Sequence, residues 1–141
     1  MLRRIALSLV VVVLVAPMLA GCGGQQGTIK IGLEAPLTGD YAYEGQGFQQ
    51  AVSLLVEQTN EAGGLLGREV ELVVEDDAGD PTQAALVAQR LVDADVVAVI
   101  GAYNSTATEP ASEIYNEAGL LHITPSSTAT RLTEKGFERF F

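Results

Sequence analysis

One stretch of the chain, residues 96–108, constrains the fold more than any other. Val96 to Ile100 is a short, uncharged run rich in β-branched residues, which is typical of a parallel strand covered on both faces. It leads through Gly101 into a segment whose apolar residues recur at helical spacing from Ala111 to Ala118. The stretch therefore predicts a buried strand, a turn at its carboxyl end and a helix.

The same unit recurs along the chain. Apolar runs predict further strands, and residues at helical spacing predict the helices between them. We expect strands at residues 28–35, 69–75, 96–100 and 120–123, helices at 46–60, 81–92 and 111–118, a short helix within 129–135, and the start of a strand at 137–141. Strands that alternate with helices predict an α/β fold with a parallel sheet, helices on both faces and right-handed crossovers. We expect the strand order 2-1-3-4.

This strand order makes the carboxyl ends of the first, third and fourth strands neighbours. The loops that follow these strands, residues 38–44, 103–106 and 124–128, are rich in hydroxyl and amide side chains. Small ligands bind at this edge of open α/β sheets, and the N–H groups at a helix start favour a negative group such as a carboxylate. The three loops therefore predict a site for a small polar ligand.

The first 21 residues have the pattern of a signal peptide. Arg3 and Arg4 precede an apolar run, Leu7 to Val15, that is too short to span a bilayer. The small residues that follow end in the only cysteine, Cys22, and this ending resembles a bacterial lipobox, which implies lipidation of Cys22. The alternative is a plain cleaved signal with an incidental cysteine. Residues 22–27, rich in glycine and glutamine, are then expected to form a flexible tether.

Charge and cysteine content exclude several classes of function. The formal net charge of the chain is −10, and loss of the signal peptide would remove two positive charges. Nucleic-acid binding needs basic patches, so we expect no nucleic-acid partner. A lone cysteine cannot form an internal disulfide or a cysteine-based zinc site.

Two groups of residues invite a functional interpretation but have a simpler one. The acids Asp76, Asp77 and Asp80 do not match the spacing of a calcium loop, so we expect a turn and a helix cap rather than a metal site. His122 lies within an apolar strand, where a core histidine is more common than a ligand or a base.

The chain lacks the motifs of the common enzyme classes on this kind of fold. There is no G-x-G-x-x-G sequence, no phosphate-binding P-loop and no G-x-S-x-G turn. We therefore predict binding without catalysis, with no catalytic residue and no cofactor. An enzyme of flavodoxin-like architecture is the alternative.

Several stretches, taken together, carry a resemblance to a known family. They are Ala35–Gly39 with Gly45, Asn60–Arg68, Asp76–Pro81, Pro110–Tyr115 with Gly119, and Pro125. In these stretches the chain, from about Ile29 to its last residue, resembles the extracytoplasmic solute-binding proteins of branched-chain amino acid ABC transporters. The family has the type I periplasmic binding fold, in which two α/β lobes close on a ligand.

The resemblance implies particular ligand-binding residues. Ser105 and Thr128 match positions that bind the ligand's carboxylate and ammonium groups, and Ser126 and Ser127 match neighbours that contribute backbone groups. Glu44 stands where some members place an aromatic side chain over the ligand, and Tyr43 is its near substitute. Tyr43 and Tyr103 could contact ligand or be half-buried loop aromatics. Ser105 and Thr128 could instead be helix caps.

The resemblance also implies a longer protein. Members are considerably longer, so residues 28–141 are expected to be an incomplete first lobe, with the second lobe absent and the last strand left with an open edge. We expect the 141-residue piece to be marginally stable and to bind ligand poorly. The implied partners are an amino acid or amide, the permease subunits, and the membrane through lipid on Cys22, on the extracytoplasmic face of the envelope. The ligand-binding domain of an amino acid sensor is the alternative.

Overall fold

A computed structural model describes residues 27–141, and its sheet has the predicted topology. Four parallel strands lie in the order β2-β1-β3-β4, which confirms the predicted order 2-1-3-4. The strands are β1 (Ile29–Ala35), β2 (Val70–Asp76), β3 (Ala98–Ile100) and β4 (Leu121–Ile123). Because every strand is parallel to its neighbours, the carboxyl ends of all four lie at one edge of the sheet.

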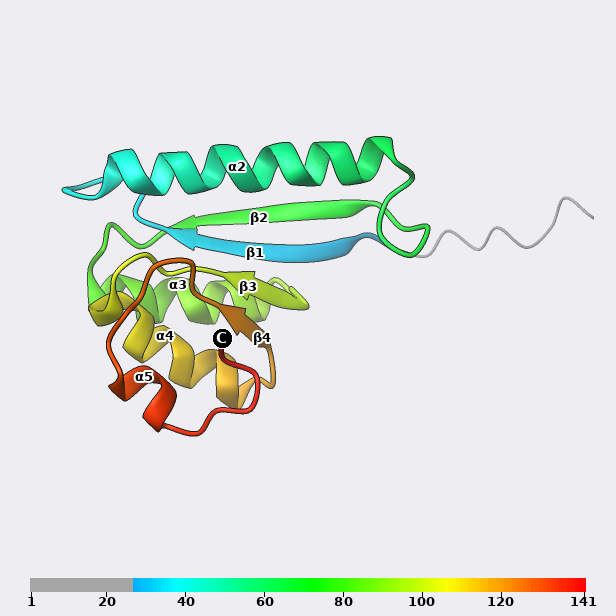
Figure 1. The fold of residues 1–141 in the computed structure, drawn as a ribbon. Coiled ribbons are helices and arrows are strands. Elements are labelled where there is room, and N and C mark those ends of the chain that lie inside the picture. Colours follow the sequence, from blue (N-terminus) through cyan, green and yellow to red (C-terminus); the bar gives the residue numbers. More distant parts are fainter. Residues whose placement is uncertain (1–26) are drawn as a thin grey trace, which may run out of the picture.

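Helices cover both faces of the sheet, as predicted. The long helix α2 (Ala42–Glu61) lies along one face, next to β1 and β2, whereas α3 (Pro81–Asp93) and α4 (Ser105–Glu117) pack on the other face (Figure 1). The short helix α5 (Arg131–Glu134) follows β4 within the range predicted for it.

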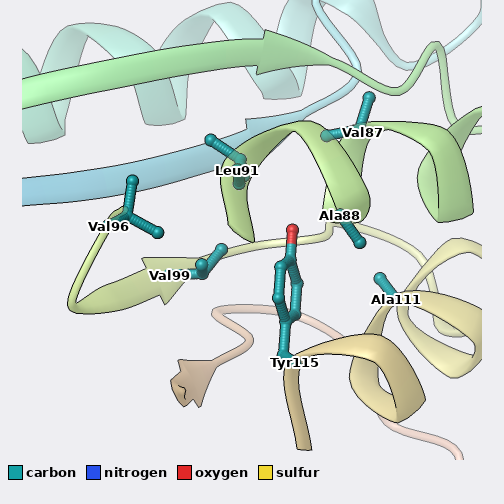
Figure 2. Packing of buried hydrophobic residues seen from close by; sticks show 7 residues of the cluster. All are labelled: Val87, Ala88, Leu91, Val96, Val99, Ala111 and Tyr115. Atoms are coloured by element: carbon teal, nitrogen blue, oxygen red, sulfur yellow. The ribbon is translucent and has the colours of Figure 1, made fainter. Parts of the chain in front are cut away.

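The core lies between the sheet and the α3–α4 face. Figure 2 shows Tyr115 rising from α4 among the small side chains of both helices and Val99 of β3. The cluster consists of Val87, Ala88, Leu91, Val96, Val99, Ala111 and Tyr115, all buried. A side chain at Gly32 would put its Cβ 3.2 Å from atoms of both Leu91 and Val99. Glycine at this position therefore lets α3 approach the sheet closely.

The helix ends follow the local chemistry that the sequence predicts. The N–H groups of Thr82 and Gln83 donate to the Asp80 carboxylate at 2.9 and 2.8 Å, and Pro81 is the first helical residue. After α2, Gly63 and Gly64 take positive φ angles of 103° and 78°. These end the helix in the manner expected of glycine.

Two helix starts differ from the prediction. Helix α2 begins at Ala42 rather than at residue 46, so the polar loop after β1, predicted at residues 38–44, is shorter than predicted. Glycine at position 45 weakens the helical pattern of the sequence, so the start of the helix was not predicted. Glycine is required there because a Cβ would lie 2.1 Å from the Pro36 carbonyl oxygen. Helix α4 begins at Ser105, so residues 105–108, predicted as turn, form its first turn.

The end of the chain adds a short stretch of pairing beside β4. The His122 N–H donates to the Arg139 carbonyl at 2.8 Å, and the Phe141 N–H donates to the His122 carbonyl at 2.9 Å. His122 and Phe140 form a parallel bridge, which confirms the predicted beginning of a strand in residues 137–141.

The predicted signal peptide and the lipidation of Cys22 lie outside the described residues, as does the tether apart from Gly27. Within residues 27–141, no helix combines the length and the hydropathy needed to cross a membrane.

Candidate functional site

The loops after β3 and β4 meet at the carboxyl edge of the sheet, as the predicted site requires. The backbone N–H groups of Thr128 and Ala129 each donate to Ser105 Oγ at 3.2 Å. Ser105, at the first position of α4, is partly buried, while Thr128 is exposed. The structure therefore brings the two principal candidate residues into contact.

Neither Ser105 nor Thr128 serves as a helix cap, so the capping alternative does not explain them. Asn104 caps α4, because its side-chain oxygen accepts from the Ala107 N–H at 2.8 Å. The Asn104 side chain also donates to the Gly79 carbonyl at 3.0 Å and so ties the β2 loop to the β3 loop. The short helix α5 has Thr130, not Thr128, at its cap position.

The turn after β4 is fixed by a chain of hydroxyl groups. Ser127 Oγ lies 2.6 Å from Thr108 Oγ1 and donates to the Tyr103 carbonyl at 3.3 Å. The Ser127 N–H donates to Thr124 Oγ1 at 3.2 Å. Ser126 lies in the same turn and is partly buried. The Ser127 side chain is thus engaged within the protein, and its backbone is held in place for any contact with a ligand.

Aromatic side chains form a second wall beside this turn. The Tyr103 ring packs against Tyr41 at a centroid distance of 5.3 Å and against Phe48 at 5.7 Å. Tyr43 is 88% exposed. A cavity of about 440 Å³ opens here, and we call it the α2 cavity. It is lined by Tyr43, Glu44, Gln46, Gly47, Phe48, Gln50 and Tyr103.

Tyr43 and Glu44 hold different positions from those predicted. They were expected in the loop after β1, but both lie in the first turn of α2. An acidic residue in the first turn is favoured by the helix dipole. The helix therefore sets the positions of both residues, and both line the α2 cavity.

Asp76 shapes the loop that leads into α2. Its carboxylate accepts from the Leu37 N–H at 2.8 Å, the Thr38 hydroxyl at 2.6 Å and the Ala78 N–H at 2.8 Å. Burial raises the pKa of Asp76, but the hydrogen bonds from Thr38, Ala78 and Leu37 outweigh burial and lower the pKa overall. The ionised carboxylate thus joins the β1 loop to the β2 loop.

A buried acid pair lies beneath the site. Glu34 and Asp77 are both 0% exposed, and the Tyr115 hydroxyl donates to Glu34 Oε2 at 2.7 Å. Glu34 Oε1 and Asp77 Oδ2 have no hydrogen-bond partner within residues 27–141. Burial raises the pKa of Glu34 well above its ordinary value, and the nearby charge of Asp77 adds to this. Burial therefore favours the protonated form of Glu34.

His122 is a core residue, as predicted. It is 2% exposed, its Nε2 donates to the Gly101 carbonyl, and its ring packs edge-on against Tyr115 and Phe140. Burial lowers the pKa of His122 to about 4. The histidine is therefore neutral at physiological pH.

The three aspartates at the end of β2 and in the turn that follows act in a turn and a cap, as predicted. Asp76 and Asp77 accept backbone N–H groups of the turn, and Asp80 caps α3. Within the described part of the chain, no group of three or more His, Cys, Asp or Glu side chains is arranged to hold a metal ion.

Comparison with known proteins identifies the family. Residues 28–141 match the sequence profile described as periplasmic binding protein. The chain belongs to the periplasmic binding protein family. The family consists of binding proteins rather than enzymes, in agreement with the prediction of binding without catalysis.

Curated relatives of this periplasmic binding protein chain are much longer than it is. An amino acid binding protein of Pseudomonas aeruginosa is 45% identical over 114 residues, which are 80% of this chain and 30% of the relative. A leucine-, isoleucine-, valine-, threonine- and alanine-binding protein of the same organism is 43% identical and is covered to 31%. The chain therefore spans about a third of the length of these relatives.

A solved structure supports the same assignment. The branched-chain amino acid transporter substrate binding protein LivJ of Streptococcus pneumoniae, in complex with isoleucine, superposes with a TM-score of 0.77 at 37% identity. The match covers 81% of this chain and 33% of that one. The fold is therefore that of one lobe of such a protein.

Sequence reasoning missed two groups of residues near the site. Tyr41 and Phe48 pack against Tyr103, and Phe48 and Gln50 line the α2 cavity. The helical spacing identified Phe48 as a helix residue but gave no sign of this role. The Glu34–Tyr115 contact joins residues 81 positions apart in the sequence, and no local sequence pattern predicts it.

Proposed function

We propose that residues 28–141 form the first lobe of an extracytoplasmic substrate-binding protein of an ABC importer, which captures an amino acid between two lobes and delivers it to the permease. Branched-chain amino acids are the first candidates, because the relatives' names specify them. Lipid on Cys22 would anchor the protein to the membrane. The observation that carries the proposal is the meeting of Ser105 with the Thr128 backbone at the carboxyl edge of the sheet.

The chemistry of this edge suits the head group of an amino acid. Ser105 Oγ accepts two backbone N–H groups, so its own proton remains to be donated to a carboxylate. The N–H groups of Ser105 and Thr106, in the first turn of α4, have no helical carbonyl to reach. The carboxylate would therefore meet hydroxyl and N–H donors together with the positive end of a helix dipole. The Thr128 hydroxyl, which is exposed, is available to the ammonium group.

An unfinished apolar surface supports a longer protein. Leu121 and Ile123 of β4 are 38% and 43% exposed, and Leu55 of α2 is 61% exposed. Between α2 and the sheet lies an apolar groove of about 240 Å³ that includes Leu55, Ile31 and Ile100. Burying such residues is worth about 1.5–3 kcal/mol each. We infer that the remaining length found in the relatives covers this face and provides the second lobe, which would close over the site.

Calorimetry on the full-length protein tests the proposal. We expect Ser105→Ala to weaken binding of the amino acid ligand by about 1–3 kcal/mol, because a buried polar group of the ligand loses its partner. Ser53→Ala, at an exposed position of α2, is the matched control and should leave the affinity unchanged. Equal affinities for wild-type and Ser105→Ala protein, with both folded, would place the ligand elsewhere.

A further inference from the structure

The α2 cavity has a composition that differs from that of the Ser105–Thr128 edge. Of its seven lining residues, three are aromatic, one is an acid and none is basic. The edge beside it presents hydroxyl and N–H groups instead. Tyr103 belongs to both, because its ring lines the cavity and its carbonyl accepts from Ser127. A ligand whose head group lies at the edge therefore has the cavity as the place for its side chain.

The cavity is large enough for this role. Its volume of about 440 Å³ is within the range of small-molecule sites, about 300–1,000 Å³. The aromatic walls are preformed, because Tyr103 packs between Tyr41 and Phe48. The first turn of α2 fixes the position of Glu44 on the cavity wall.

A carboxylate on an aromatic wall discriminates between side chains. Glu44 is partly buried and forms no salt bridge with a basic residue of the described chain. If a second lobe closed over an aliphatic side chain, this carboxylate would lose water without gaining a partner, which is costly. A cationic side chain would instead pair with the carboxylate and lie against the aromatic faces, which attract cations.

We propose that Glu44 selects a ligand with a cationic side chain, such as a basic amino acid, and that the α2 cavity receives that side chain. This inference rests on the proposed function, because it needs the head group of an amino acid at the Ser105–Thr128 edge. It names a different class of ligand from the branched-chain amino acids in the relatives' names, within the amino acids that the proposed function admits. The dipole of α2 accounts for an acid in the first turn but not for its place in an aromatic cavity.

Isothermal titration of the full-length protein tests the inference with pairs of ligands that differ in charge. Arginine is compared with citrulline and lysine with norleucine, and leucine serves as the branched-chain reference. We expect the cationic member of each pair to bind more tightly. Glu44→Gln should weaken binding of arginine and lysine by about tenfold or more, because the cations lose a charge partner, and should tighten binding of leucine, because no carboxylate is then desolvated without a partner.

A matched variant separates the local effect from the change in net charge. Glu57 is an exposed acid of α2 outside the cavity, so Glu57→Gln should leave all affinities unchanged. Three outcomes overturn the inference. If leucine binds more tightly than arginine and Glu44→Gln changes neither affinity, the inference about Glu44 is wrong and the proposed function is retained. An equal loss for every amino acid would place Glu44 at the ammonium group instead. A lack of binding by any amino acid would reject the proposed function as well.

Discussion

The hydrogen bond between Tyr115 and Glu34 gives the sharpest test of the packing under the site. Tyr115→Phe removes one oxygen atom and keeps the ring among Val99, Ala88 and Ala111 (Figure 2). The apolar contribution of the ring is therefore nearly unchanged. What is lost is the 2.7 Å bond to Glu34 Oε2 in a fully buried setting.

The magnitude follows from the state of the Glu34 carboxyl group. Its other oxygen, Oε1, has no hydrogen-bond partner in the described structure, so the substitution leaves the whole carboxyl without one. Orphaning a buried polar group costs about 1–3 kcal/mol, and we expect the upper half of that range here, about 2–3 kcal/mol. With an m-value of about 3 kcal/mol/M in urea, the unfolding midpoint should fall by roughly 0.7–1 M.

Urea unfolding of the full-length protein, followed by circular dichroism, measures this change. Tyr43→Phe removes the same atom from a side chain that is 88% exposed, and should cost less than about 0.5 kcal/mol. If the two variants unfold at the same urea concentration, the Tyr115–Glu34 bond contributes nothing and the reasoning is wrong.

Two further predictions concern the stability of the lobe. The pKa of Glu34 is raised in the folded state. The folded protein therefore keeps a proton that the unfolded chain loses above the ordinary glutamate pKa of about 4.3. The contribution of Glu34 to the free energy of unfolding is full below that pH and falls as the pH rises toward the raised pKa. Tyr115 and Asp77, the titratable groups facing Glu34, do not reverse this sign, because Tyr115 stays protonated and the pKa of Asp77 is also raised by burial. Unfolding measured between pH 4 and 8 should therefore show a flatter pH dependence for Glu34→Gln than for wild type, and identical slopes would contradict the assignment. Asp80→Ala should cost about 1 kcal/mol in the same unfolding assay, because the N–H groups of Thr82 and Gln83 lose their acceptor, whereas Asp93→Ala, at the other end of α3, serves as a control without such a cap.

The sequence alone predicted the sheet because each strand and helix carried its own local signal. The run of β-branched residues before Gly101 and the cap Asp80-Pro81 report on their immediate surroundings, and both predictions were confirmed. Right-handed crossovers limited the possible strand orders, and the expected order 2-1-3-4 among them was confirmed. The meeting of Ser105 with Thr128 followed in turn from that order.

Features set by contacts between distant parts of the chain were not predictable in this way. Helix α2 starts four residues earlier than predicted. A glycine by itself argues against a helix, and the close packing of Gly45 on the Pro36 backbone, which requires glycine there, has no local signal. The turn after β3 is capped by Asn104 rather than by Ser105, and the choice between neighbouring polar residues depends on Gly79 in another loop. Glu34, in a strand, gave no sign that its carboxyl would be buried against Tyr115.

The placement of the ligand remains a prediction for all seven candidate residues. The geometry brings Ser105, Ser127 and Thr128 to one turn, and it places Tyr43, Glu44 and Tyr103 on the adjoining cavity. Ser126 directly precedes Ser127 in the turn after β4. The two walls meet at Tyr103, which is where a bound amino acid would pass from its head group to its side chain.

A crystal structure of the full-length protein with its amino acid bound would test the central claim most directly. The account predicts the ligand's carboxylate within hydrogen-bond distance of Ser105 Oγ and the N–H groups of Ser105 and Thr106, its ammonium group near the Thr128 hydroxyl, and its side chain directed into the α2 cavity. A ligand held at another edge of the sheet, with Ser105 and Thr128 free of contact, would contradict it.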